Sequence, residues 1–241
     1  MSNHIRIGTW NVERAVPTKI DRVLARLKAA DADIWVLTET RDALSIAGSY
    51  HAVNSDLQPG TNESARWVSI WSRFALLAPV AVRDSGRTAA ALYATAQGQL
   101  LVYGTVLPWQ SDPGSTNTAA YWSEHHRVIP EQADEWKALV GLYPDAALCV
   151  AGDLNMNLGG KHYYGTALGR RLLEEGLANA GLACVTYTER VPSGKLAEPH
   201  IDHVCLPHSW AERAQVVDAW PGTIDRERLS DHSAIVVEVR A

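Results

Sequence analysis

The spacing of apolar side chains changes along the chain, and each change predicts a different element. Residues 4–12 alternate and then turn polar, which predicts a strand, and the short apolar run at residues 33–37 predicts another. Residues 17–30 between them have helical spacing, because one face carries Ile20, Val23, Leu24 and Leu27. The chain therefore begins with a strand, a helix and a second strand.

A meander of strands is predicted next. Residues 66–71 alternate, with tryptophan and serine on one side and valine and isoleucine on the other. Gly98 separates the last two strand-like runs, which is typical of a hairpin. The runs that follow at short intervals are 74–82, 89–96 and 99–107.

The second half of the chain mixes loops, helices and short apolar runs. Residues 108–118 are rich in Pro, Gly, Ser and Asn, so we expect a loop there. Periodicity predicts helices over residues 119–143 and 166–180, and Gly181 ends the second of them. The remaining strand-like runs are 146–150, 183–186, 201–206, 215–218 and 234–239.

This mixture of strand–helix–strand units and meanders favours an α/β architecture with helices packed outside two face-to-face sheets. A dinucleotide-binding fold is disfavoured, because no Gly-x-Gly-x-x-Gly follows the first strand and Gly8 alone cannot hold a pyrophosphate. The chain has 241 residues and shows no internal repeat, low-complexity tract or interdomain linker. We therefore expect one domain over residues 1–241.

Composition is typical of an ordinary globular protein, with 46% hydrophobic and 20% charged residues. The net charge of -5 neither indicates nor excludes a surface that binds polyanions, since a basic rim can lie on an acidic protein. Cys149, Cys184 and Cys205 fall in apolar stretches without metal-type spacing, so we expect reduced core thiols. No segment resembles a signal peptide or membrane span, which makes the cytoplasm the expected location.

Five short polar clusters end or follow these apolar runs. Carboxylates, amides and a histidine at the ends of buried strands are costly to desolvate, so their number indicates a shared task. Holding a divalent cation and a phosphate is such a task, and it predicts metal-assisted phosphoester hydrolysis. The clusters are Thr9-Trp10-Asn11, Thr38-Glu39-Thr40, Gly152-Asp153-Leu154-Asn155, Ile201-Asp202-His203 and Ser230-Asp231-His232.

The clusters, in this order, resemble those of the endonuclease/exonuclease/phosphatase superfamily, typified by deoxyribonuclease I. The match spans nearly the whole chain. The resemblance implies a four-layer α/β sandwich, with two mixed β-sheets packed face to face and helices outside. It also implies that Glu39 is the principal metal ligand, with Asn11 and Asp231 nearby. The hard oxygen of Glu39 suits Mg²⁺ or Mn²⁺, although the same glutamate after a strand is also compatible with an exposed side chain or a helix N-cap contact.

His232 stands beside Asp231 and after Asp202, which permits a carboxylate–histidine pair with the second ring nitrogen facing substrate. The resemblance implies that Asp202 is the partner of His232. Asp153 and Asn155 are suited to handling the attacking water and hydrogen-bonding a phosphoryl oxygen. Whether Asp153 or His232 takes the water proton is left open by the sequence.

Two further residues are candidates for substrate binding. Arg41, two residues beyond Glu39, can place a guanidinium near a phosphate, or can simply be solvated on the surface. Trp109 lies in a Pro-Trp-Gln loop, where an indole can stack on a base or another ring.

One position departs from the family pattern. Most hydrolytic members have a His or Tyr where the strand after the meander ends, and this chain has Val106. The usual scheme then needs a substitute from a loop. The candidates, each by type more often a surface residue, are His125, His126, His162 and Tyr163.

The sequence therefore predicts a divalent-metal-dependent phosphoesterase that hydrolyses phosphodiester bonds, with DNA or RNA cleavage favoured. A small-molecule phosphatase or phosphodiesterase of the same superfamily is the first alternative. A catalytically weak protein that grips nucleic acid or another partner is the second, and Val106 is its only support. No oligomeric state is predicted, because substrate and assembly depend on loops without a readable code.

Overall fold

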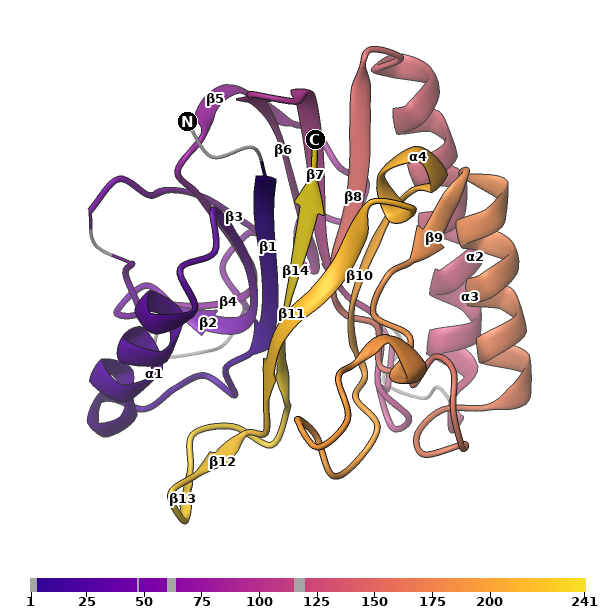
Figure 1. Ribbon diagram of the computed structural model, residues 1–241. Coiled ribbons are helices and arrows are strands. Elements are labelled where there is room, and N and C mark those ends of the chain that lie inside the picture. The colour runs from indigo at the N-terminus through magenta and orange to yellow at the C-terminus, as the bar shows by residue number, and fades with distance from the viewer. Residues whose placement is uncertain (1–3, 47, 60–63, 115–119) are drawn as a thin grey trace.

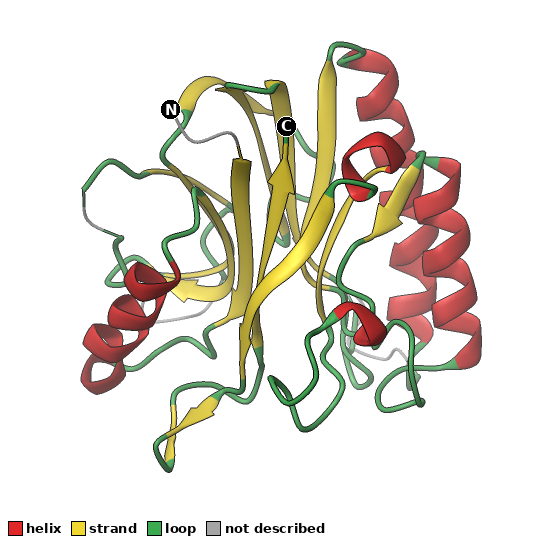
Figure 2. Cartoon of the chain, viewed as in Figure 1, coloured by secondary structure: helices red, strands yellow, loops and turns green. Residues whose placement is uncertain are grey.

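The computed structural model describes residues 4–46, 48–59, 64–114 and 120–241. Two six-stranded sheets pack face to face, and helices lie on both outer faces (Figures 1 and 2). The four-layer α/β sandwich expected from the sequence is confirmed.

The first sheet contains the opening strand–helix–strand unit. Its strands β1 and β2 are parallel, because helix α1 (Pro17–Ala30) carries the chain back across the outer face between them. Pro17 begins the helix, where its missing N–H costs nothing, and Val23 and Leu27 are buried. In spatial order the sheet is β11 (Ala214–Trp220), β14 (Ala234–Arg240), β1 (His4–Asn11), β2 (Ile34–Arg41), β4 (Ala65–Ser72) and β3 (His51–Asn54).

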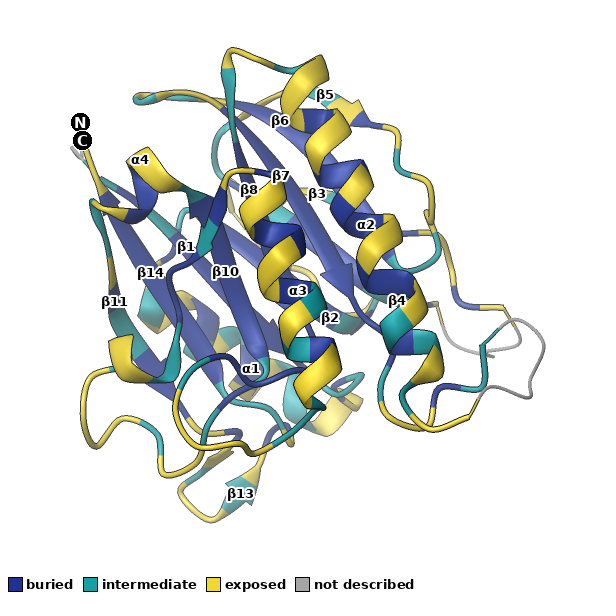
Figure 3. Ribbon diagram, turned by 90° about the vertical axis from the view of Figure 1, so that its right-hand side faces the viewer, coloured by how far each residue is buried: buried dark blue, intermediate teal, exposed yellow. Residues whose placement is uncertain are grey.

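The second sheet contains the meander and is covered by two helices, α2 (Ser123–Leu142) and α3 (Ala167–Asn179). Strands β7 and β8 are parallel because α2 connects them, and the other neighbours are antiparallel. Figure 3 shows the buried sides of α2 and α3 turned toward the sheet. In spatial order the sheet is β5 (Ala75–Val80), β6 (Thr88–Thr95), β7 (Gly98–Val106), β8 (Ala146–Asp153), β10 (Asp202–Pro207) and β9 (Leu182–Cys184).

Short elements complete the fold. They are the helix α4 (His208–Ala211), the 3₁₀ turn η1 (Thr188–Arg190) and a small hairpin of β12 (Thr223–Ile224) and β13 (Glu227–Arg228). Cys149, Cys184 and Cys205 are buried free thiols, as expected. Within the described ranges, no helix is both long and apolar enough to cross a membrane.

Several boundaries differ from the sequence-based expectation. Strand β2 continues to Arg41, four residues beyond the apolar run, so Glu39 lies inside a strand. Strand β3 was not expected, because three of its four residues are exposed and no apolar pattern marks it. Helix α2 begins at Ser123; residues 115–119, which the loop and helix predictions reach, lie outside the described ranges.

Candidate active site

All five polar clusters meet at one end of the sandwich. Strands β1, β2 and β8 run toward this end, whereas β10 and the approach to β14 start from it. The two sheets therefore deliver their polar residues to one edge. A cavity of about 650 Å³ opens there, and the predicted site residues that line it are Glu39, Trp109, Asp153, Asn155, Asp202, Asp231 and His232.

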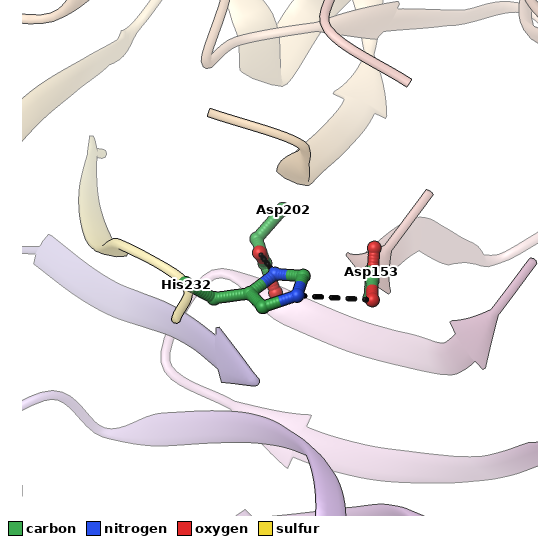
Figure 4. A group of neighbouring side chains, drawn as sticks. All are labelled: Asp153, Asp202 and His232. Atoms are coloured by element: carbon green, nitrogen blue, oxygen red, sulfur yellow. Dashed lines mark hydrogen bonds and ion pairs between the residues drawn. The ribbon is translucent and has the colours of Figure 1, made fainter. Parts of the chain in front are cut away.

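His232 and Asp202 form a hydrogen-bonded pair (Figure 4). His232 Nδ1 lies 2.6 Å from Asp202 Oδ2, so Nδ1–H donates to the carboxylate. The His232 backbone is held on both sides, because its N–H donates to Ser230 Oγ and its carbonyl accepts from Trp10 Nε1. This fixes the ring with Nε2 directed at Asp153, whose Oδ2 lies 3.9 Å away. Burial by itself lowers the pKa of His232, but Asp202 and Asp153 outweigh it and raise that pKa above its usual range.

Asp153 is a buried carboxylate held by two donors. Its Oδ1 accepts from the Asn155 backbone N–H at 2.9 Å, and its Oδ2 accepts from Asn11 Nδ2 at 3.1 Å. Burial raises the pKa of Asp153 above its usual range, Asp202 adds to the rise, and His232 opposes it. Asp153 thus holds a proton more readily than an ordinary aspartate.

The turn at the end of β8 depends on two residues, Gly152 and Asn155. Gly152 has φ +132, and a Cβ there would lie 2.1 Å from the Thr105 carbonyl oxygen, so only glycine fits. Asn155 adopts φ 47, and its side-chain Nδ2 donates to the Leu107 carbonyl at 2.8 Å. Asn155 therefore ties the end of β8 to the loop that follows β7.

Glu39 and Asn11 form the other side of the site. Glu39 has φ 49 within β2, an uncommon conformation for a non-glycine residue. Its Oε1 accepts from Asn11 Nδ2 at 3.1 Å, and its Oε2 lies 3.9 Å from Arg14 Nε. Asn11 Oδ1 accepts from the Glu13 backbone N–H. Asn11 therefore stands between the carboxylates of Glu39 and Asp153.

This donor set fits a hard divalent cation. The carboxylates of Glu39 and Asp231 are ligand types that Mg²⁺ and Mn²⁺ accept, and two more buried carboxylates lie nearby. Asn11 directs its Nδ2 at Glu39 and Asp153, so its amide would have to turn over to present Oδ1 to an ion. Asp231 is half exposed, and its Oδ2 lies 3.5 Å from Arg228 Nη2. The ligand-type atoms of Asp153, Asp202 and His232 also lie within 4.8 Å of one another. The Asp202–His232 hydrogen bond already engages two of those three groups, which favours a role in proton transfer over a role as metal ligands for these residues.

Val106 lines the cavity and lies opposite Asp153 in the β7–β8 register. The expectation that His125 is a surface residue is wrong: it is fully buried, and its Nε2 bonds to the Leu154 carbonyl. His126 bonds to Thr166 Oγ1, and His162 is exposed.

Of the four proposed substitutes for a donor at Val106, Tyr163 reaches the described cavity lining, where it is 52% exposed. Its neighbour Tyr164, which the sequence did not single out, lines the cavity too.

Trp109 is held at the cavity edge by its neighbours. Its ring centroid lies 6.0 Å from that of Trp67, and the Arg87 guanidinium lies over both rings. Arg87 also pairs with the buried carboxylate of Asp112, which fastens the Trp109 loop to β6.

The structure does not bring Arg41 to this cavity. Arg41 lines a separate cavity of about 240 Å³ with Pro17 and Asp42. The guanidinium that does line the site belongs to Arg228, which pairs with Glu13 and Asp231. Sequence reasoning missed Arg228 and Glu13, although each lies two residues from a polar cluster.

Comparisons with known proteins agree with this geometry. A family model described as Endonuclease/Exonuclease/phosphatase family matches residues 8–232. No curated protein matches the sequence significantly.

Solved structures share the fold at low sequence identity. A 3′ phosphatase called NExo from Neisseria, bound to a product DNA hairpin, has a TM-score of 0.72 and 17% identity over 98% of this chain and 100% of its own. An AP endonuclease from Archaeoglobus fulgidus has a TM-score of 0.65 and 18% identity over 97% of this chain and 98% of its own. A protein from Beutenbergia cavernae described as endonuclease/exonuclease/phosphatase has a TM-score of 0.61 and 20% identity over 99% of this chain and 72% of its own.

Proposed function

This chain belongs to the Endonuclease/Exonuclease/phosphatase family, and on that premise we propose that it is a divalent-metal-dependent phosphoesterase that cleaves phosphodiester bonds in nucleic acid. The resemblance drawn from the polar clusters is confirmed at the level of the family. The observation that carries the proposal is the Asp202–His232 pair with Nε2 aimed at Asp153 inside a cavity.

The proposed roles of these three residues follow from the directions of their pKa shifts. The raised pKa of His232 keeps its ring protonated at neutral pH, so it serves as a cation facing the phosphoryl group and not as the base. The raised pKa of Asp153 suits it to accept the proton of the attacking water. Asp202 orients the ring and compensates its charge. Asn155 lies at the same turn and is proposed to position a phosphoryl oxygen.

Glu39, Asn11 and Asp231 would hold Mg²⁺ or Mn²⁺. When bound, the cation polarises a phosphoryl oxygen and offsets charge that builds in the transition state. The three residues supply oxygen donors only, so thiophilic metals such as Cd²⁺ gain no special affinity there.

Nucleic acid is favoured as substrate because Trp109 offers an aromatic ring at the cavity edge. The 3′ phosphatase with a similar fold is seen with a DNA hairpin, which supports DNA as the first substrate to test. A small-molecule phosphatase or phosphodiesterase is the second candidate. The cavity volume of about 650 Å³ is in the range of small-molecule sites, and Arg228 is the single Arg or Lys in its described lining.

A substrate screen tests the proposal. The probes are single-stranded DNA, hairpin DNA with a 3′ phosphate, RNA, p-nitrophenyl phosphate and bis(p-nitrophenyl) phosphate, each with Mg²⁺, Mn²⁺ or EDTA. We expect metal-dependent cleavage of a nucleic acid, abolished in His232→Asn and retained in His51→Asn, which alters an exposed histidine of β3. Cleavage of the monoester alone would favour the second candidate, and binding of DNA without turnover would favour a catalytically weak protein.

A further inference from the structure

Tyr164 lines the same cavity as Asp153 and Val106, and it comes from the loop between β8 and α3. Its ring stands edge-on to Trp122, with centroids 5.1 Å apart. Its phenol oxygen accepts a long hydrogen bond, 3.4 Å, from the backbone N–H of Gln110. Tyr164 therefore joins the loop after β8 to the loop after β7, above the site.

One buried side chain fixes the loop that carries Tyr164. Asn157 Oδ1 accepts from the backbone N–H groups of Tyr163 and Tyr164, at 2.9 and 3.0 Å. Asn157 Nδ2 donates to the carbonyls of Gly159 and Lys161, and Asn157 N–H donates to the Tyr164 carbonyl. Five hydrogen bonds to one fully buried residue give Tyr164 a defined position before substrate arrives.

The phenol of Tyr164 lies in the same cavity lining as Asp153 and keeps its proton at neutral pH. Burial raises the pKa of Tyr164, the hydrogen bond from Gln110 lowers it, and the charge of Asp153 raises it, with a net rise. The bond from Gln110 uses a lone pair of the phenol oxygen, so its proton stays available to a group in the cavity. Val106, at the end of β7, offers methyl groups and no donor.

We propose that Tyr164 is a catalytic residue that donates its phenol proton to the departing oxygen of the substrate, the task for which Val106 has no group. The inference rests on the proposed function and assigns one further role within the same site.

The step balances as an ordinary hydrolysis. The oxygen of water bonds to phosphorus while the bond from phosphorus to the departing oxygen breaks. The water proton passes to Asp153, and the Tyr164 proton passes to the departing alkoxide, which leaves as an alcohol. An alkoxide is a stronger base than a phenolate, so this second transfer is downhill. Asp153 then releases a proton to solvent and the phenolate regains one.

Tyr164→Phe tests the assignment, because it keeps the ring on Trp122 and removes only the hydroxyl. The probes are a labelled single-stranded DNA oligonucleotide, which has alkoxide leaving groups, and bis(p-nitrophenyl) phosphate, whose aryl leaving group needs no proton. With Mg²⁺ present, we expect kcat on the oligonucleotide to fall by about 10²-fold and kcat on the aryl diester to stay within about threefold.

Tyr121→Phe, which removes a hydroxyl from a side chain 72% exposed outside the cavity lining, is the matched control and keeps both rates. Equal losses on the two probes by a Tyr164→Phe protein that is folded, as judged by its Tm, would mean that Tyr164 only holds the two loops together. That result would overturn this inference and leave the proposed function standing. The same holds if Tyr163→Phe produces the selective loss instead. If the parent hydrolyses neither probe, the proposed function fails first and this inference falls with it.

Discussion

His232 Nδ1 lies 2.6 Å from Asp202 Oδ2, and the two residues reach this contact from different sheets. His232 leads into β14 of the first sheet, whereas Asp202 begins β10 of the second. Asn11 repeats the pattern, because its backbone N–H donates to Asp202 Oδ1 and its side chain to Asp153, again across the sheets. The proposed catalytic groups are therefore brought together by the packing of one sheet on the other.

A substitution that pushes the two sheets apart should therefore lower the activity, even though it lies away from the site. Gly104 lies in β7, where a Cβ would come 2.6 Å from Val68 Cγ1 and 3.0 Å from Val36 Cγ1 of the opposite sheet. We expect Gly104→Ala to cost about 1–3 kcal/mol of unfolding free energy and to lower hydrolysis as well. Gly141→Ala in α2, with no atom within 4 Å of the new Cβ, is the control and should keep the rate and lose no stability, since alanine favours a helix over glycine. A Gly104→Ala protein with parental Tm and rate would show that the sheets adjust without disturbing the pair.

Asp202→Asn should damage the reaction more than the fold. The amide keeps the size of the side chain but removes the charge that orients and stabilises the protonated ring of His232. We expect kcat to fall by roughly 10²-fold or more, and the loss in Asp202→Asn/His232→Asn to be far smaller than the product of the single losses, because the two residues act as one unit. Kinetics of the two single variants and the double variant check this, and multiplicative losses would count against a shared role.

Glu39→Gln should weaken the response to the cation. The amide preserves the shape and the bond to Asn11 but loses the charge that attracts a hard ion. We expect the Mg²⁺ concentration for half-maximal activity to rise by about tenfold or more, and the increase in Tm that Mg²⁺ gives the parent to shrink. Glu212→Gln, on the surface, is the control. An unchanged Mg²⁺ titration in both readouts would remove Glu39 from the metal site.

His125 should make the fold sensitive to acid. Burial lowers the pKa of His125 to about 4, against the opposing effect of its bond to Leu154, so the folded state binds this proton less readily than the unfolded state does. The contribution of His125 to the free energy of unfolding is therefore fully present above a pH of about 6.5. It is lost as the pH drops toward about 4, which lowers the free energy of unfolding by up to about 3 kcal/mol.

His125→Gln keeps an N–H donor and does not titrate, so it should lose less stability over that pH range than the parent. Urea unfolding at several pH values measures the effect, with the exposed His162→Gln as control. Parallel pH profiles for parent and His125→Gln would assign the acid sensitivity to other groups.

The sequence was informative wherever side-chain burial produced a regular pattern. The strands that carry Asn11 and Asp153 alternate or run apolar, and strand ends at one edge of a sandwich bring their polar residues together. Both the fold and seven of the residues that line the cavity could therefore be anticipated. Strand β3 left no such trace, because it is an exposed edge that gains its order from pairing with β4. The backbone of Glu39 at φ 49 is likewise not marked by any sequence pattern.

The substrate-binding candidates had mixed outcomes. The sequence offered both Arg41 and Trp109, but β2 ends with Arg41 at a separate cavity, whereas the Arg87–Asp112 pair holds the loop of Trp109 at the site. Tyr164 owes its place to the hydrogen bonds of Asn157, which no periodicity reveals. Side chains positioned by such loop networks can be found only once the chain is folded.

The most direct measurement of the central claim is the rate of hydrolysis of a labelled DNA oligonucleotide by the parent and by His232→Asn, across a Mg²⁺ titration that includes EDTA. The account predicts that cleavage by the parent requires Mg²⁺ and stops in EDTA, and that His232→Asn, folded with near-parental Tm, is slower by roughly 10²-fold or more at every Mg²⁺ concentration. Cleavage by the parent that persists in EDTA, or a folded His232→Asn protein that matches the parent, would contradict it.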